Sequence, residues 1–312
     1  MFEKITAQYV IVPKTKTAVM EMSQSSGITL IDEKDRNPMK TTTFGVGEMI
    51  LDALEKGCRN FLIGIGGSAT NDAGVGMLRA LGFEFYDKDG NEVFIGAESV
   101  GKICKIGTDN VNPKIKECTF NIACDVKNPL CGKDGCSAVY GPQKGATPEM
   151  VKIMDRYIDD FALLTKKTFA LADKDYPGAG AAGGLGFAFM TYLGGTLKSG
   201  VELVIEQIGL EEYVKKSDIV ITGEGRLDSQ SVMGKAPVGV ARLAKKHNKK
   251  VIAFCGVASK DAGVCNNYGI DAYFPIISSV CSLQDAMDVD NAYNNLANSC
   301  EQVFRVIKFA EE

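Results

Sequence analysis

Apolar residues along the chain form short runs typical of buried strands, and glycine-rich or polar segments separate these runs from stretches with helical spacing. The run Asn60–Ile65 predicts a strand, and a short helix is expected near Val75–Leu81. Residues 120–125 predict another strand. Thr147-Pro148-Glu149 then has the composition of a helix cap and first turn, and the apolar spacing continues past Leu164. This order of strands, loops and helices is typical of α/β proteins.

A β-hairpin is predicted between the first two of these strands. Residues 83–86 and 92–95 alternate apolar and polar side chains on either side of the glycine turn Asp87-Lys88-Asp89-Gly90. Such a hairpin brings antiparallel pairing, so we expect a mixed sheet in this part of the chain.

The last third of the chain alternates strands and helices more regularly. The expected elements are strands at 218–222, 250–255 and 272–277, a helix at 238–246 and a long C-terminal helix. This is a parallel, Rossmann-like order. We therefore predict an α/β fold with two unlike α/β domains: residues 1–210 with a mixed sheet and glycine-rich binding loops, and residues 211–312 with a parallel sheet.

Composition narrows the class of protein. The 312 residues include 35 basic and 39 acidic side chains without a basic block, which argues against a nucleic-acid partner. No apolar run has the length of a membrane helix and the start has no signal-peptide core, so we expect a cytoplasmic protein without a membrane partner. Ten scattered cysteines favour reduced thiols, and the single histidine, His247, lies among four lysines, which argues against zinc.

The segment from Gly64 to Asp72 joins the first strand to its helix, and its backbone amides could converge on an anion. The alternative is a tight turn in which a polar side chain caps the helix. Gly64, Gly66 and Ala69 also fit a loose dinucleotide fingerprint, with Asp87 and Asp89 downstream. That interpretation, a NAD-dependent dehydrogenase, is weak because the helix is short and the two acids fall in a hairpin turn.

Two other strand ends carry acidic residues. Asp125 could accept a hydroxyl proton or bind magnesium, although an Asp that organises a turn is about equally expected. In Thr222–Asp228, an acid between two glycines suits a loop that approaches phosphates, and Arg226 could neutralise charge; a mixed-charge surface loop is the alternative. The glycine-rich loop Gly178–Gly186 could fold over a ligand, but close helix packing is the better interpretation from the residues alone.

These stretches together resemble the bacterial glycerate kinase family of the first class, over nearly the whole chain and in the family's order. The resemblance rests on Arg36-Asn37-Pro38 with Lys40-Thr41-Thr42-Thr43, Ile65 to Asp72, Cys124-Asp125-Val126 with Asn128-Pro129-Leu130, Gly178 to Gly186, and Thr222 to Asp228. It implies ATP- and Mg²⁺-dependent phosphorylation of D-glycerate by two unlike α/β domains with the active site in the cleft between them. The chain has no P-loop sequence, so ATP would bind by another design.

Candidate roles follow from the motifs and the resemblance together. The residues assigned to catalysis are Asp125, Asp72, Lys40 and Arg226. The residues assigned to substrate or phosphate binding are Gly66, Gly67, Ser68, Ala69, Thr70, Asn71, Asn128, Gly183 and Gly184. Glu224 and Asp228 are assigned to Mg²⁺. The sequence does not determine the oligomeric state, and a homodimer is possible.

The chain departs from the family pattern in one respect. Family members usually begin with a segment reading Pro-Asp-Ser-Phe-Lys-Gly and later Asp-Gly-Gly-Glu-Gly-Thr, and neither stretch occurs here. The Rossmann-like domain is therefore expected to be incomplete relative to the family. A truncated or non-catalytic homologue stays open as the alternative to an active kinase.

Overall fold

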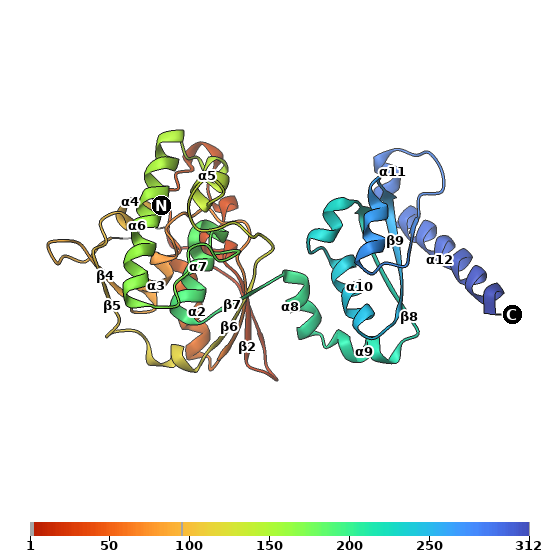
Figure 1. Cartoon of the computed structure of the whole chain (residues 1–312), viewed down its shortest axis with the longest axis horizontal. Helices are drawn as coiled ribbons and strands as arrows, with labels where there is room; N and C mark the ends of the chain where they lie inside the picture. The colour runs from red at the N-terminus through yellow and green to blue at the C-terminus, as the bar shows by residue number, and fades with distance from the viewer. Residues whose placement is uncertain (1–2, 95, 312) are drawn as a thin grey trace. The chain divides into compact units, whose positions relative to one another are not determined.

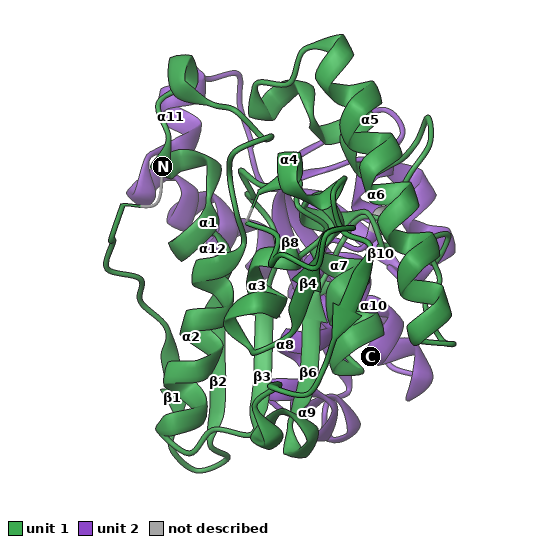
Figure 2. Cartoon of the chain, turned by 90° about the vertical axis from the view of Figure 1, so that its left-hand side faces the viewer, with its two compact units in different colours: residues 1–200 green, residues 201–312 purple. Residues whose placement is uncertain are grey.

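The computed structural model describes residues 3–94 and 96–311 (Figure 1). The chain divides into two compact units, residues 1–200 and residues 201–312 (Figure 2). No helix in the described part of the chain is both long enough and apolar enough to cross a bilayer.

Unit 1 is built on a five-stranded sheet with the order β1-β2-β3-β6-β7. The strands are β1 (Val10–Val12), β2 (Thr17–Glu21), β3 (Asn60–Gly64), β6 (Thr119–Ala123) and β7 (Thr196–Lys198). β1 runs antiparallel to β2, and all other neighbours are parallel. The predicted mixed sheet is therefore confirmed, and its antiparallel member is the edge strand β1.

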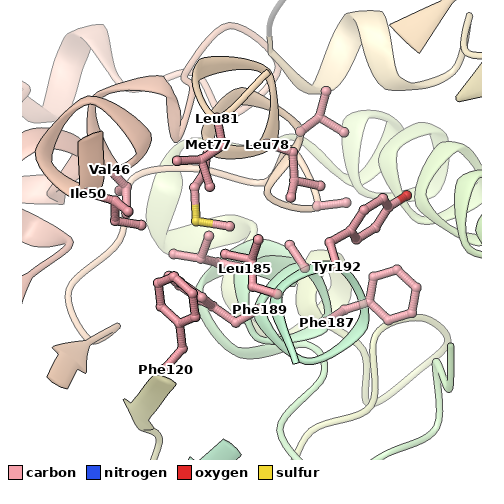
Figure 3. Close-up of a cluster of buried hydrophobic side chains, with 14 of the residues drawn as sticks. Val46, Ile50, Met77, Leu78, Leu81, Phe120, Leu185, Phe187, Phe189 and Tyr192 are labelled. Atoms are coloured by element: carbon pink, nitrogen blue, oxygen red, sulfur yellow. The ribbon is translucent and has the colours of Figure 1, made fainter. Parts of the chain in front are cut away.

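The core of unit 1 lies between this sheet and its helices. Those helices are α1 (Ser23–Ser26), α2 (Phe44–Glu55), α3 (Val75–Ala80), α4 (Ala97–Val100), α5 (Cys136–Tyr140), α6 (Pro148–Thr168) and α7 (Ala181–Leu193). Buried side chains of α2, α3 and α7 pack with Phe120 of β6 (Figure 3). Phe61 of β3 stacks on Phe120 with a centroid distance of 4.9 Å. α2 and α6 bury their apolar faces here, and α7 is buried at most of its positions. This burial is the main stabilising contribution expected for such a layer.

The expected hairpin forms only in part. Its turn closes, because Gly90 N donates to Asp87 O at 3.1 Å, and Val93 N donates to Phe85 O at 2.8 Å. However, β4 (Glu84–Tyr86) forms its ladder with β5 (Lys105–Gly107), in a separate two-stranded sheet. The expected second strand is thus reduced to one antiparallel bridge between Tyr86 and Glu92, and Ile95 lies outside the described residues. The mixed character of the main sheet does not come from this hairpin.

Unit 2 is built on a parallel three-stranded sheet with the order β10-β9-β8, which confirms the predicted parallel sheet. Its strands are β8 (Ile219–Leu227), β9 (Lys250–Ala258) and β10 (Ala272–Pro275), and its helices are α8 (Gly200–Gln207), α9 (Leu210–Lys216), α10 (Ala236–Lys246), α11 (Leu283–Met287) and α12 (Val289–Glu311). The units divide at Gly200, earlier than the expected boundary near Leu210. The reason is that Ile205 of α8 packs against the core of unit 2.

β8 is longer than its sequence suggests. The expected loop starting at Thr222 is instead strand as far as Leu227, with Glu224 paired to Cys255 and Arg226 paired to Val257 of β9. Only Asp228 lies beyond the strand. The parallel ladder supplies hydrogen bonds that outweigh the low strand propensity of Gly223 and Gly225.

Candidate active site

The parallel strands of unit 1 place three chain segments at one edge of the sheet. Gly64 of β3 is in register with Glu21 of β2 and with Ala123 of β6. The segments that follow these residues therefore leave the sheet at its carboxyl edge, where open α/β sheets bind ligands. Gly66 and Asp125 both belong to these segments.

The loop Gly66–Asp72 turns its side chains inward and its first two glycines outward. Gly66 and Gly67 are exposed, whereas every residue from Ser68 to Asp72 is buried. The loop is held against the segment after β2, because Ile28 N donates to Gly67 O at 2.8 Å and Ala69 N donates to Ser26 O at 2.9 Å. Within the described residues, the amides of Gly66, Gly67 and Ser68 donate no backbone hydrogen bond. Free amides on an exposed glycine turn are suited to binding an anion.

Lys144 contacts this loop from the protein interior and was missed by sequence reasoning. It ends the 3₁₀ helix η4 (Pro142–Lys144) and is 2% exposed. Its Nζ donates to Ser68 Oγ at 2.8 Å and to Thr70 O at 2.7 Å. Burial lowers the pKa of Lys144 to about 8. The sequence around it, Gly141-Pro142-Gln143-Lys144-Gly145, signals a turn but not the burial of an ammonium group.

Asp72 is fully buried and organises the backbone around it. Its carboxylate accepts hydrogen bonds from Thr43 N at 2.8 Å, Thr43 Oγ1 at 2.9 Å, Gly74 N at 3.1 Å and Gly76 N at 3.2 Å. Burial raises the pKa of Asp72, although the Thr43, Gly74 and Gly76 donors act in the opposite direction. Hydrogen bonds to the loop, to the start of α2 and to α3 fit a residue that positions these segments.

Two polar atoms of the loop are buried without a partner. Asn71 Nδ2 donates to Ser137 Oγ at 2.8 Å, but Asn71 Oδ1 has no hydrogen-bond partner among the described residues. Thr70 Oγ1 is likewise buried and unpartnered. Buried polar groups without partners are uncommon in folded proteins and often mark functional sites.

The glycine-rich segment 178–186 packs directly on this loop. Gly183 and Gly184 both have left-handed backbone conformations inside α7. A Cβ at Gly183 would lie 2.1 Å from Thr70 O, and a Cβ at Gly184 would lie 2.7 Å from the Cα of Ala73. Asn128 connects the same segment to its own loop, because its carbonyl accepts from Gly178 N and Gly180 N. The contacts of these glycines are thus with protein backbone.

Asp125 and Lys40 are the two unit 1 candidates with charged side chains that are exposed. Asp125 Oδ1 accepts a hydrogen bond from Gly200 N at 2.9 Å, so the carboxylate contacts the residue that begins α8. Lys40 lies in the turn before α2, where its amide donates to Asn37 O at 3.1 Å. The structure therefore groups residues 66–72, Gly183 and Gly184, and leaves the Asp125 and Lys40 side chains accessible.

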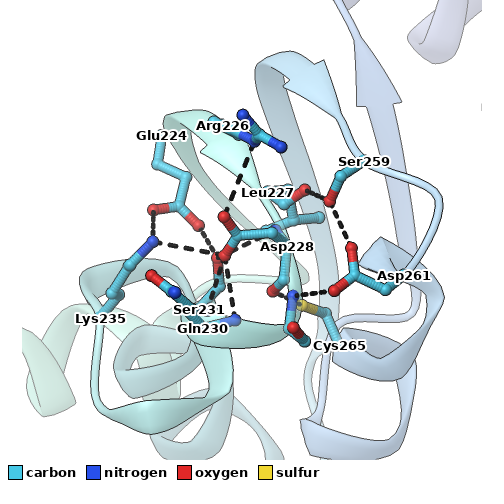
Figure 4. A network of polar contacts seen from close by, with 11 residues as sticks. Glu224, Arg226, Leu227, Asp228, Gln230, Ser231, Lys235, Ser259, Asp261 and Cys265 are labelled. Atoms are coloured by element: carbon cyan, nitrogen blue, oxygen red, sulfur yellow. Dashed lines mark hydrogen bonds and ion pairs between the residues drawn. The ribbon is translucent and has the colours of Figure 1, made fainter.

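In unit 2, the side chains of Glu224, Asp228 and Lys235 point toward one another near the carboxyl end of β8 (Figure 4). Lys235 Nζ lies 3.4 Å from Asp228 Oδ1 and 3.9 Å from Glu224 Oε2. Ser231 connects the acids further: its hydroxyl donates to Glu224 Oε1, and its amide donates to Asp228 Oδ1 at 3.2 Å. Arg226 Nε is 3.8 Å from Asp228 Oδ2.

The charge of Asp228 is set by these neighbours. Desolvation alone would raise the pKa of Asp228, but the Lys235 ammonium and the amides of Gln230 and Ser231 outweigh it and hold the pKa below its usual value. Asp228 caps the 3₁₀ helix η5 (Ser229–Met233). Asp261 supports the same turn, because Ser229 N donates to its Oδ2 at 3.2 Å and Ser259 Oγ to its Oδ1 at 2.5 Å.

The donor set of unit 2 fits a hard cation bound together with phosphates. Glu224 Oε2 and Asp228 Oδ2 each take part only in an ion pair and accept no hydrogen bond within the described part of unit 2. Carboxylate oxygens of this kind are the ligands that Mg²⁺ takes beside substrate phosphates. Among the described residues, no group of three or more His, Cys, Asp or Glu side chains forms a complete metal cage.

The acids of the dinucleotide interpretation lie elsewhere. Asp87 Oδ1 accepts from Asp89 N and Asn91 N, each at 2.9 Å, so it stabilises its own turn after β4. β4 belongs to the small antiparallel sheet, whereas the fingerprint needs an acid at the end of a parallel strand.

Comparison with known proteins identifies the family. Residues 1–308 match the model of the glycerate kinase family. The chain is 45% identical over 301 residues to the glycerate 2-kinase of Escherichia coli K12, covering 96% of this chain and 78% of that protein. It is 40% identical over 309 residues to the glycerate kinase of Bacillus subtilis 168, covering 99% and 80% respectively.

A solved structure agrees with this assignment. The crystal structure of a Salmonella typhimurium LT2 protein, described as a candidate glycerate kinase 2, matches with a TM-score of 0.85 and 39% identity. The match covers 98% of this chain and 80% of the other. The α/β fold with one mixed and one parallel sheet is thus the fold of that protein too. The chain belongs to the glycerate kinase family.

Proposed function

We propose that this chain is a glycerate kinase that transfers the γ-phosphoryl group of ATP to a hydroxyl of D-glycerate. The observation that carries the proposal is the 40–45% identity, over 96–99% of the chain, to relatives named as glycerate kinases. The exposed glycine amides after β3 and the acidic end of β8 supply the binding chemistry that such a reaction needs.

Unit 1 is assigned to the hydroxy acid. The free amides of Gly66, Gly67 and Ser68 bind an anionic group of the substrate. Asp125 orients the attacking hydroxyl and accepts its proton. The hydroxyl oxygen bonds to the γ-phosphorus, the bond from that phosphorus to the bridging oxygen breaks, and ADP leaves with the electron pair. The exposed Asp125 carboxylate beyond β6 supports this role. Lys40 is assigned to offset negative charge on the substrates.

Unit 2 is assigned to the nucleotide phosphates. Glu224 Oε2 and Asp228 Oδ2 would hold Mg²⁺, which offsets phosphate charge when it is bound. Arg226, whose side chain is 69% exposed, can turn from Asp228 toward an incoming phosphate. Lys235 shares the two carboxylates and is the second cation available there.

Four of the candidate residues support the site from within. Asp72 fixes the loop and the start of α3 through its buried carboxylate, so we assign it to positioning. Gly183 and Gly184 allow α7 to approach the loop, and the side-chain amide of Asn128 is engaged by Tyr140 and Asp134. Their contribution to substrate binding is therefore through the shape of the loop.

The proposal is tested by measuring ADP release from ATP with a set of small hydroxy acids. D-glycerate, L-glycerate, glycolate and D-lactate are each added to the purified chain with and without Mg²⁺. We expect ADP release that depends on D-glycerate and on Mg²⁺, with far less for the other acids. ADP release that is independent of any hydroxy acid, or absent from a folded preparation, contradicts the proposal.

A further inference from the structure

The ammonium of Lys144 is buried without a counter-ion. Within the described residues its two hydrogen-bond acceptors are a hydroxyl and a carbonyl, and it forms no salt bridge. Burying an unpaired charge is costly, so such a group is retained where another negative group compensates it. Both acceptors belong to the loop whose glycine amides face outward.

The titratable groups near Lys144 form no hydrogen bond or ion pair with it among the described residues. Asp72 and Cys136 are the two that act on it electrostatically. Burial raises the pKa of Asp72, and the carboxylate already accepts hydrogen bonds from Thr43, Gly74 and Gly76. Burial also raises the pKa of the Cys136 thiol to about 11, so this group is neutral at physiological pH. No described acid therefore contacts the Lys144 ammonium directly, and the Asp72 carboxylate acts on it only through space.

A second observation at the same loop points to a ligand. Thr70 Oγ1 and Asn71 Oδ1 are buried and without hydrogen-bond partners among the described residues. Thr70 also supplies the carbonyl that Lys144 binds and that Gly183 packs against. The loop is thus fixed on its inner side and carries unsatisfied polar atoms at its centre.

We propose that Lys144 is a positioning residue that holds the amides of Gly66, Gly67 and Ser68 in their anion-binding arrangement and supplies positive charge to the anion from behind the loop. The anionic group is the carboxylate of the hydroxy acid or a phosphate of the nucleotide, and the kinetic test separates the two. The proposal rests on the assignment of this loop to substrate binding. Lys144 does not touch the reacting atoms, so it acts through the loop.

The test compares Lys144→Met and Lys144→Arg with the wild type. Lys152→Met, an exposed lysine of α6, serves as the matched control. We expect Lys144→Met to raise KM for one substrate about 10- to 100-fold, with a smaller effect on kcat. A rise in KM for D-glycerate assigns the loop to the carboxylate, and a rise in KM for ATP assigns it to a phosphate. Two KM values within about twofold of the wild type overturn the proposal.

The pH profile supplies a readout that a merely structural lysine would not move. With the Lys144 ammonium titrating at about pH 8, the wild-type kcat/KM for the affected substrate falls above that pH. Lys144→Arg keeps a charge throughout this range, so this fall should disappear. An unchanged fall in the Arg variant contradicts the proposal.

Two further arms keep the result decisive. If Lys144→Met does not fold, Ser68→Ala is used instead, because it removes one acceptor of the ammonium while the charge stays. We expect a several-fold rise in the same KM, and an unchanged KM overturns the proposal.

Binding is also measured without turnover, as the rise in Tm on adding D-glycerate or inorganic phosphate. If the wild type binds an anion but does not phosphorylate D-glycerate, the proposed function fails, and loss of that Tm rise in Lys144→Met still supports the role of Lys144. A Tm rise that persists in Lys144→Met overturns it.

Discussion

Gly183 packs so closely on Thr70 that a Cβ at position 183 would lie 2.1 Å from the Thr70 carbonyl oxygen. Gly183 also has φ of 69°, a left-handed conformation that side chains disfavour. We expect Gly183→Ala to lower the free energy of unfolding by about 3 kcal/mol, because backbone strain and overpacking add. Urea unfolding measures this value.

Gly194 provides the matched control for that substitution. It has φ of 63°, and a Cβ there would meet no atom within 4 Å. Gly194→Ala should therefore cost only the conformational part, about 1 kcal/mol. Equal losses in the two variants would show that the contact between Gly183 and Thr70 contributes nothing.

Asp125→Asn tests the assignment of the proton acceptor. The carboxylate is exposed, so folding should change little, whereas kcat should fall about 10²- to 10⁴-fold because an amide cannot accept the hydroxyl proton. Circular dichroism and steady-state kinetics separate the two effects. Asp134→Asn, another exposed acid of unit 1, should keep wild-type kcat. Turnover of Asp125→Asn at the wild-type level would remove this residue from the mechanism.

The burial of Lys144 makes stability depend on pH in a direction that can be worked out. Its pKa is about 8 in the folded chain and 10.5 for an unperturbed lysine, so between these values the unfolded chain binds more protons. The free energy of unfolding therefore rises with pH across that window, by at most about 3 kcal/mol from this group. Lys144→Met lacks this rise. We expect the difference between wild type and variant to grow from pH 8 to pH 10 and to stay flat below pH 7; a difference constant across this range contradicts the burial of a charged lysine.

Glu224→Gln tests the cation assignment in unit 2. A neutral amide is a weaker Mg²⁺ ligand, so the Mg²⁺ concentration for half-maximal activity should rise about tenfold, while KM for D-glycerate changes little. The control is Glu301→Gln, which alters an exposed ion pair with Arg305 on α12. An unchanged Mg²⁺ requirement in Glu224→Gln would move the cation to other ligands.

The features that were predicted correctly are those that neighbouring residues along the chain determine. The strand Asn60–Gly64, the short helix α3 and the Thr147 cap of α6 occur where glycine turns, apolar spacing and capping residues indicate them. The family resemblance rested on five separate motifs in order, and the match of residues 1–308 to the family model confirms it.

The features that were missed depend on tertiary contacts. Residues 223–227 read as a loop because glycines are unfavourable in strands, yet pairing with β9 keeps them extended. The expected strand after the turn at Gly90 is reduced to a single antiparallel bridge between Tyr86 and Glu92, and β4 forms its ladder with β5, about twenty residues further along the chain. Lys144 resembles a surface lysine in sequence, and only the folded loop around Ser68 and Thr70 reveals its burial.

The most direct test of the central claim is ³¹P NMR of the purified 312-residue chain with ATP, Mg²⁺ and D-glycerate. We expect a phosphoglycerate signal to grow in step with ADP while the γ-phosphate signal of ATP declines. Without D-glycerate, the phosphoglycerate signal should be absent. Which phosphoglycerate forms identifies the hydroxyl that attacks. A folded chain that produces ADP without phosphoglycerate, or neither product, would contradict the account.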